Sequence, residues 1–146
     1  MLNGYEEMVK VVPVGDIDAN GDAKDNIVHM IPAGRRWTLD EAWLSAEATV
    51  ADADTNYNTF FLRDSEGNEL CRLENGPAAT GTPITHAPVE FGLGTGAAWV
   101  SGSYDSQYVE LGNDSTDEYL SIQTEKTGNG LAVPGLSALL EGRWTA

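Results

Sequence analysis

The sequence predicts an all-β protein, a β-sandwich or jelly-roll of roughly eight or nine short strands. Apolar residues recur in short alternating runs, which is typical of half-buried strands. The runs are separated at near-regular intervals by polar turns. The chain also contains 16 Gly and 6 Pro among 146 residues. This composition suits a turn-rich β protein better than a helical bundle.

A chain of 146 residues fits one domain with a hydrophobic core of its own. We therefore expect a short N-terminal arm, residues 1–7, followed by a single β-sandwich domain, residues 8–146. The arm carries Leu2 and Tyr5 among polar residues and has no obvious partner strand. It could become ordered on another protein, or it could be a frayed terminus.

Each expected strand is an apolar run that ends at a turn signal such as Gly15 or Pro32–Gly34. The first two strands, separated by one polar turn, are expected to be neighbours. The signal is weaker over 89–93 and 97–100. The expected strands are Met8–Val14, Asn26–Ile31, a strand within Arg36–Ala51, Thr59–Arg63, Glu69–Leu73, Val89–Leu93, Ala97–Val100, Tyr108–Leu111, Glu118–Thr124 and Leu136–Trp144.

The segment Arg36–Ala51 fits two patterns. Thr38 and Glu41 have the spacing of a helix capping box, and a helical stripe of apolar residues follows them. Read as a strand, the segment places Ala42, Leu44 and Ala46 on one face with Ala48 and Val50. Glu41, Ser45, Glu47 and Thr49 then lie on the other face. The strand is favoured because a helix would leave Leu44 outside.

The strongest local signal is a β-hairpin. Two apolar alternating runs, Thr59–Arg63 and Glu69–Leu73, flank the Gly-containing loop Asp64–Asn68. Such a pattern indicates two antiparallel strands joined by a short turn.

Charge limits the classes of partner. The chain has 23 Asp and Glu against 8 Lys and Arg, a formal net charge of −15. Affinity for nucleic acid depends on Lys and Arg displacing counterions, so no nucleic-acid partner is expected. No apolar run approaches the ~18 residues of a membrane span, so no membrane partner is expected either. The acidic excess suits a solvated surface, with divalent cations or a basic partner as alternatives.

One turn resembles the start of a calcium loop. Asp16, Asp18, Asn20 and Asp22 supply oxygen ligands at alternating positions, with Gly21 in the turn. The twelfth position of such a loop, however, is Ile27 where a bidentate Glu is needed. The loop also lies between expected strands. Calcium is therefore one hypothesis for these residues, and an ordinary acidic β-turn is the other.

Catalytic signatures are absent from the sequence, and we expect no enzyme activity. His29 and His86 stand 57 positions apart without a spaced carboxylate or Cys beside them. The single cysteine, Cys71, lies at an apolar strand position where a small buried side chain is expected. It also rules out an intramolecular disulfide. No cofactor is expected other than the possible calcium ion.

Aromatic residues indicate where contact with a partner could occur. The chain has four Trp residues, and exposed aromatic side chains are enriched at the centres of protein interfaces and on sugar-binding platforms. Trp37, beside the basic pair Arg35 and Arg36, is the first candidate for such a residue. The alternative is that Trp37 packs against the edge of the sandwich. Together with Leu2 and Tyr5 of the arm, these residues form the predicted interface.

Several strand-and-turn phrases resemble small structural proteins of tailed bacteriophages, in particular head decoration (cement) proteins. The similarity touches about two-thirds of the chain and includes no catalytic motif. The phrases are Ile31–Ala42, Ala46–Ala53, Asn56–Phe60, Lys126–Leu131 and Pro134–Leu136.

The resemblance implies a β-sandwich or jelly-roll that assembles as a homotrimer on the outer surface of an icosahedral capsid. There it would bridge neighbouring copies of the major capsid protein without catalysis. A strongly acidic protein suits that location, because packaged DNA repels it. Two other classes remain open: a phage tail or fibre component, and a carbohydrate-binding β-sandwich module.

Overall fold

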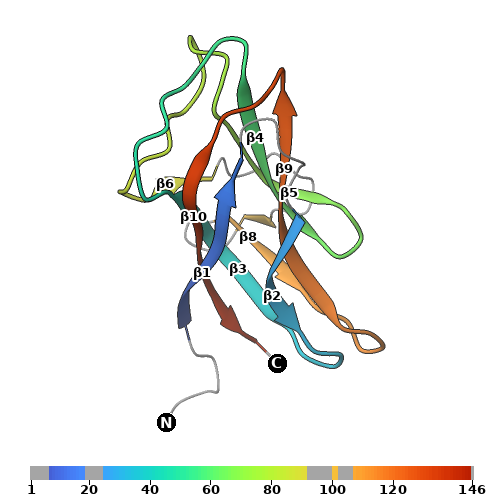
Figure 1. Ribbon diagram of the computed structural model, residues 1–146. Coiled ribbons are helices and arrows are strands. Elements are labelled where there is room, and N and C mark those ends of the chain that lie inside the picture. Colours follow the sequence, from blue (N-terminus) through green and yellow to red (C-terminus); the bar gives the residue numbers. More distant parts are fainter. Residues whose placement is uncertain (1–6, 19–24, 92–99, 102–106, 146) are drawn as a thin grey trace.

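The computed structural model describes residues 7–18, 25–91, 100–101 and 107–145. The described residues form two antiparallel β-sheets and contain no helix, so the predicted all-β sandwich is confirmed (Figure 1). Eight strands have five or more residues, and two short ones have two residues each. The strands are β1 (Glu7–Ile17), β2 (Asp25–Ile31), β3 (Trp37–Ser45), β4 (Tyr57–Asp64), β5 (Glu69–Glu74), β6 (Val89–Glu90), β7 (Val100–Ser101), β8 (Gln107–Leu111), β9 (Glu118–Thr127) and β10 (Val133–Trp144).

The strand order is that of a jelly-roll. The six-stranded sheet runs β1-β10-β3-β8-β7, with β6 also paired to β3, and the four-stranded sheet runs β2-β9-β4-β5. The long strands therefore form four nested antiparallel pairs: β1 with β10, β2 with β9, β3 with β8, and β4 with β5. Successive pairs alternate between the two sheets, which is the double Greek-key arrangement of a jelly-roll.

The first two strands are neighbours, as expected, but they do not pair with each other. β1 pairs with β10 in one sheet and β2 pairs with β9 in the other, so the turn between them crosses from sheet to sheet. The two strands are still close along one side of the sandwich, where Asn26 Nδ2 donates a hydrogen bond to the Val14 carbonyl oxygen at 2.8 Å. Each strand lies at the end of its sheet.

The strand prediction for Arg36–Ala51 is confirmed over Trp37–Ser45. Ala42, Leu44 and Ala46 face the core, as expected for one side of a strand, whereas Ala48 is exposed beyond the end of β3. A β-bulge interrupts the alternation. Glu41 pairs with Glu141 and Leu39 pairs with Gly142, so Asp40 has no partner in this ladder. Residues before and after Asp40 therefore have opposite parity relative to the core.

The predicted β4–β5 hairpin is also confirmed, and its turn is held by one carboxylate. Asp64 Oδ1 accepts hydrogen bonds from the backbone N–H groups of Glu66 and Asn68 at 3.0 and 2.8 Å. Asp64 Oδ2 accepts a third from Asn68 Nδ2 at 2.9 Å. A side chain that satisfies its own turn in this way is the reason that Asp is favoured there.

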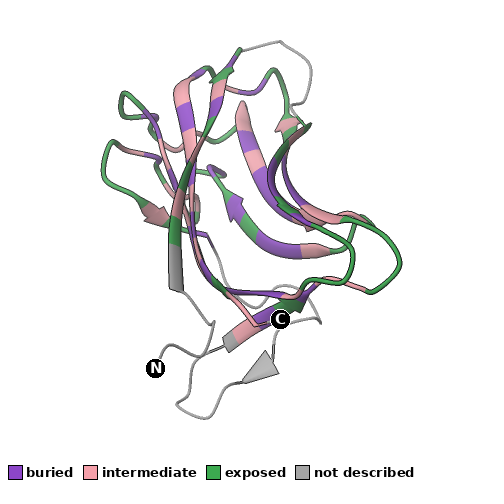
Figure 2. Ribbon diagram, turned by 90° about the horizontal axis from the view of Figure 1, so that it is seen from below, coloured by how far each residue is buried: buried purple, intermediate pink, exposed green. Residues whose placement is uncertain are grey.

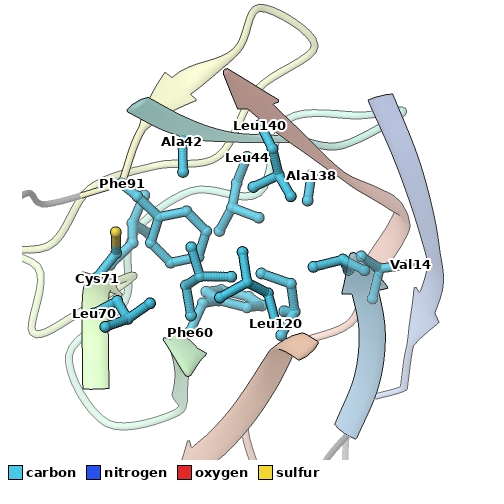
Figure 3. Packing of buried hydrophobic residues seen from close by; sticks show 14 of the residues in the cluster. Val14, Ala42, Leu44, Phe60, Leu70, Cys71, Phe91, Leu120, Ala138 and Leu140 are labelled. Atoms are coloured by element: carbon cyan, nitrogen blue, oxygen red, sulfur yellow. The ribbon is translucent and has the colours of Figure 1, made fainter. Parts of the chain in front are cut away.

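The core fills the space between the two sheets. In Figure 3, Ala42, Leu44, Ala138 and Leu140 of the six-stranded sheet point toward Phe60, Leu70 and Leu120 of the four-stranded sheet. Every one of these side chains is fully buried. Buried and partly exposed positions alternate along the strands in Figure 2, as expected when each sheet has one core face and one outer face.

Two long connections are joined at one end of the sandwich. The segments 46–56 and 75–88 meet at the isolated bridge between Val50 and Ile84. Asn75, which is fully buried, holds them together. Asn75 Nδ2 donates to the Val50 carbonyl at 3.5 Å and to the Thr82 carbonyl at 2.9 Å, and the Asn75 backbone carbonyl accepts from Ala53 N at 3.2 Å.

Candidate functional site

The residues with most potential for binding lie on the outer face of the six-stranded sheet. Residues paired across antiparallel strands share a face. Val11 pairs with Leu139, Leu139 with Trp43, and Trp43 with Glu90, so three apolar side chains and one carboxylate form a row across β1, β10, β3 and β6. Val11 is 62% exposed, and Leu139 and Trp43 are partly exposed.

Carboxylates border this row. Glu141 of β10 lies directly opposite Glu41 of β3 in the neighbouring row, and Glu90 lies at the β6 end. Val9, which is 61% exposed, pairs with Glu141 and extends the apolar surface along β1. We call this surface the Trp43 face and define it by Val9, Val11, Glu41, Trp43, Glu90, Leu139 and Glu141. It combines an apolar centre with charged residues of both signs, because Arg143, two residues beyond Glu141 on β10, forms an ion pair with Asp40 of β3 at 3.0 Å.

The outer face of the four-stranded sheet has a different character. Phe61 is 3% exposed because the guanidinium groups of Arg63 and Arg72 lie over its ring, at 4.3 and 4.9 Å from the centroid. Arg72 in turn forms ion pairs with Glu69 at 2.8 Å and Glu74 at 3.1 Å. The charged groups on this side are therefore satisfied within the chain and cover the aromatic ring.

The sequence-based choice of Trp37 as an exposed contact residue is wrong. Trp37 has no exposed surface, and its indole lies beneath Gly142 of β10, where an added Cβ atom would overlap the ring. The bulge at Asp40 is the physical reason, because it turns Trp37 toward the core while Trp43 faces outward.

Arg35 and Arg36 are at the surface, as predicted, but both interact within the chain. Arg36 Nη2 forms an ion pair with Asp114 at 2.9 Å, which connects the β2–β3 turn to the β8–β9 loop. The Arg35 guanidinium lies over the Trp144 ring, 4.5 Å from its centroid. Leu2 and Tyr5, the other predicted contact residues, lie outside the described residues, and Glu7, expected in the arm, is the first residue of β1.

The acidic groups of the β8–β9 loop serve as hydrogen-bond acceptors. Asp117 Oδ1 accepts from Ala33 N at 2.9 Å, and Glu118 Oε2 accepts from Gly112 N at 2.6 Å. These bonds, with the Arg36–Asp114 ion pair, close one end of the sandwich. Local backbone bonding is the ordinary reason for Asp and Asn in turns.

Only half of the proposed calcium ligands can be placed. Asp16 lies within β1, and its Oδ1 accepts a hydrogen bond from the backbone N–H of Gly135 at 2.8 Å, while Asp18 is exposed just beyond the strand. Asn20 and Asp22 lie outside the described residues. Within the described ranges, no group of three or more His, Cys, Asp or Glu side chains is arranged to hold a metal ion.

His29 lies between the sheets, 5% exposed, with its ring 4.2 Å from the ring of Trp37 and 5.6 Å from that of Trp144. Its Nδ1 is 3.4 Å from Lys10 Nζ. An ammonium group can only donate, so Nδ1 accepts and the ring is neutral. Burial, helped by the Lys10 charge, lowers the pKa of His29 to about 4.

Cys71 is fully buried in β5. Burial, with the nearby charges of Glu69 and Glu90, raises the pKa of its thiol to about 12. The thiolate, which is the nucleophilic form, is therefore negligible at neutral pH.

Among the described residues, no helix is long and apolar enough to cross a membrane.

Sequence reasoning did not single out Trp43 as a partly exposed aromatic residue, although a signal was present. In a strand with Ala42, Leu44 and Ala46 facing the core, Trp43 must lie with Glu41 and Ser45 on the opposite face. A large aromatic side chain on the polar face of a strand is an indication of binding.

Comparisons with protein-family models, curated proteins and solved structures found no match for this chain.

Proposed function

We propose that this chain is a head decoration (cement) protein of a tailed bacteriophage. It binds the outer surface of the icosahedral capsid as a homotrimer and bridges neighbouring major capsid proteins, without catalysing a reaction. The support is the resemblance of its strand-and-turn phrases to that family, together with an acidic jelly-roll domain. One fold can host many functions, so the fold alone does not support this one. The outer surface of the domain supplies the further support.

One observation about that surface carries the proposal. The exposed large hydrophobic side chains of the described residues are Val9, Val11, Ile27 and Met30, each at least 45% exposed. All four lie on β1 and β2, the end strands that adjoin along one side of the sandwich. Val9 and Val11 face outward from the six-stranded sheet and Ile27 and Met30 from the four-stranded sheet, so exposed apolar side chains flank this edge of the sandwich on both faces. Exposed apolar side chains of this kind are candidates for contact with another protein.

Stabilisation of a capsid by such a protein needs only binding. A ligand that binds the assembled shell, and not its dissociated subunits, stabilises the shell by about 2.7 kcal/mol per site at 100 times its dissociation constant. The net charge of −15 keeps the domain away from packaged DNA and favours the outside of the shell.

The direct test is thermal disruption of shells. Expanded shells assembled from the major capsid protein of the same phage should disassemble at a higher temperature when saturated with this protein. Removal of residues 1–6, which leaves β1 intact, should weaken binding if the arm contributes Leu2 and Tyr5 to the contact. Identical disruption temperatures with and without the full-length protein would contradict the proposed function.

A carbohydrate-binding module is the second candidate, and Trp43 is the observation that favours it. A partly exposed indole on the outer face of a sheet, opposite the carboxylate of Glu90, can stack on a sugar ring. Glycan binding would change tryptophan fluorescence. A chelator would abolish glycan binding if the Asp16–Asp22 turn holds calcium. A tail or fibre component would share the fold, and differs in its location on the virion.

A further inference from the structure

An open pocket of about 330 Å³ lies where the end strand β5, the short strand β6 and the connection 75–88 between them meet. This volume is at the lower end of the range for small-molecule sites. The lining residues are Arg72, Leu73 and Glu74 of β5, Thr80 and Thr82 of the connection, and Glu90 of β6. Apart from Leu73, every lining side chain is polar, so the pocket suits a polar ligand.

The polar groups of this pocket are held in place by contacts within the chain. The guanidinium of Arg72 forms ion pairs with Glu69 at 2.8 Å and with Glu74 at 3.1 Å, and it lies over the Phe61 ring. The connection is tied to β5, because the backbone N–H of Thr82 donates to the Glu74 carbonyl oxygen at 2.9 Å. A site whose groups are already fixed loses less conformational entropy when it binds a ligand.

These groups keep hydrogen-bonding capacity for a ligand. A guanidinium has five N–H donors and a carboxylate has about four acceptor positions, so the ion pair between Arg72 and Glu74 leaves both groups with further capacity. Within the ranges that the structure describes, the side chains of Thr80, Thr82 and Glu90 form no hydrogen bond or ion pair. The pocket therefore offers donors and acceptors on all three of its segments.

We propose that this pocket binds a saccharide, and that it does so independently of attachment to a capsid. Every hydroxyl group of a sugar both donates and accepts hydrogen bonds. Arg72 supplies donors, whereas Glu74 and Glu90 supply acceptors. The hydroxyl groups of Thr80 and Thr82 can do both. One sugar ring can thus be held from β5, from β6 and from the connection at the same time.

Other classes of small ligand fit the pocket less well. Glu74 and Glu90 repel an anion such as phosphate, and the charge of Arg72 is already paired with carboxylates. A divalent cation needs several oxygen ligands, yet no group of three or more His, Cys, Asp or Glu in the described part of the chain is arranged to hold one. An ammonium group only donates, as the guanidinium of Arg72 does, so neither can satisfy the other. A neutral polyhydroxyl ligand meets none of these obstacles.

Trp43 adjoins the pocket and extends it. Trp43 of β3 pairs with Glu90 of β6, so its partly exposed indole lies beside the strand that contributes one wall. Aromatic rings stack on the apolar faces of sugars. A disaccharide bound in the pocket can therefore place its second ring on Trp43.

The test is an NMR titration of isotope-labelled protein with glucose, galactose, mannose, N-acetylglucosamine and lactose. At least one monosaccharide should shift the backbone amide signals of residues 72–74, 80–82 and 90, with a dissociation constant of about 1 mM. Lactose should also shift the indole signal of Trp43. Thr82→Val and Glu90→Gln keep the shape of the side chain and remove a hydroxyl or a charge. Each should raise the dissociation constant by about 5- to 10-fold.

Matched controls locate the effect. Thr127→Val makes the same change at the exposed end of β9, and Glu66→Gln makes the same charge change in the exposed β4–β5 turn. Both controls should bind sugar as wild type does, and urea unfolding would establish that every variant is folded. Thr82→Val and Glu90→Gln should bind shells normally, so failure of this proposal and failure of the proposed function are distinguishable.

Three results would overturn the saccharide proposal. The first is an absence of shifts with all five sugars at tens of millimolar, well above the expected dissociation constant. The second is a set of shifts confined to residues outside the pocket, or an equal loss of affinity in Thr127→Val. The third is a stronger response of the pocket signals to ethylammonium chloride than to any sugar, which would identify a cation site.

Discussion

The protonation state of His29 depends on where the fold places its side chain. It is buried between the two sheets beside Trp37, and the Lys10 ammonium lies at its Nδ1. In the sequence, His29 lies between Val28 and Met30, and these neighbours do not indicate its burial. Its neutral state follows from the desolvation of the ring, which the tertiary structure alone determines.

This burial makes stability depend on pH. The folded-state pKa of His29, about 4, lies below the ordinary value of 6.5. Between these values the unfolded chain binds more protons, so the free energy of unfolding falls as pH decreases from about 6.5 to 4. Over this whole pH range, His29 lowers the free energy of unfolding by about 3 kcal/mol.

The prediction is tested by urea unfolding of wild type and His29→Gln across this pH range. Titration of the many carboxylates is common to both proteins, so the difference between the two curves isolates His29. The free energy of unfolding of wild type, measured relative to that of His29→Gln, should decrease as pH falls. His86→Gln, at an exposed histidine, is the control and should follow wild type. Parallel curves for wild type and His29→Gln would show that His29 is not buried neutral.

Trp37 and Trp43 illustrate the limit of residue-level reasoning. They stand six positions apart in one strand, and an uninterrupted strand would place both on the same face. The bulge at Asp40 separates them, so Trp37 lies in the core and Trp43 lies outside. Alternation around Ala42 and Leu44 is sufficient to place Trp43. The bulge arises from pairing with β10, about a hundred residues away, and no local pattern reveals it.

At the scale of elements, the local features were predictable and the long-range ones were not. The β4–β5 hairpin and the strand Trp37–Ser45 follow from alternation and turn residues close together in the chain. The assignment of β1 and β2 to different sheets depends on their distant partners β10 and β9. In a jelly-roll the first and last strands pair, so sequence neighbours frequently lie in opposite sheets.

The two long connections should depend on Asn75. Replacement by Ala removes the hydrogen bond to the Thr82 carbonyl and leaves that acceptor without its partner in a partly buried site. We expect Asn75→Ala to lower the free energy of unfolding by about 1–2 kcal/mol. Urea denaturation with a two-state fit provides the measurement.

Asn129→Ala is a suitable control for this prediction, because Asn129 is exposed and its recorded hydrogen bond is made by the backbone N–H. A change below about 0.5 kcal/mol is expected for it. Equal effects of the two substitutions would mean that the Asn75 side chain does not stabilise these connections.

At the scale of the whole molecule, charge and apolar surface are distributed unevenly. The chain has a net charge of −15, yet its exposed large apolar residues among the described ones lie on β1 and β2. The acidic excess was visible in the sequence. The location of the apolar residues required the fold, because β1 and β2 take their places through pairing with the distant strands β10 and β9. The basic pair Arg35 and Arg36 is bound within the chain and serves the closure of the sandwich.

The most direct measurement is an electron cryo-microscopy map of expanded shells saturated with this protein. We predict density for the jelly-roll on the outer surface, in threefold-related copies, in contact with neighbouring copies of the major capsid protein. Shells without added outer density would contradict the proposed function.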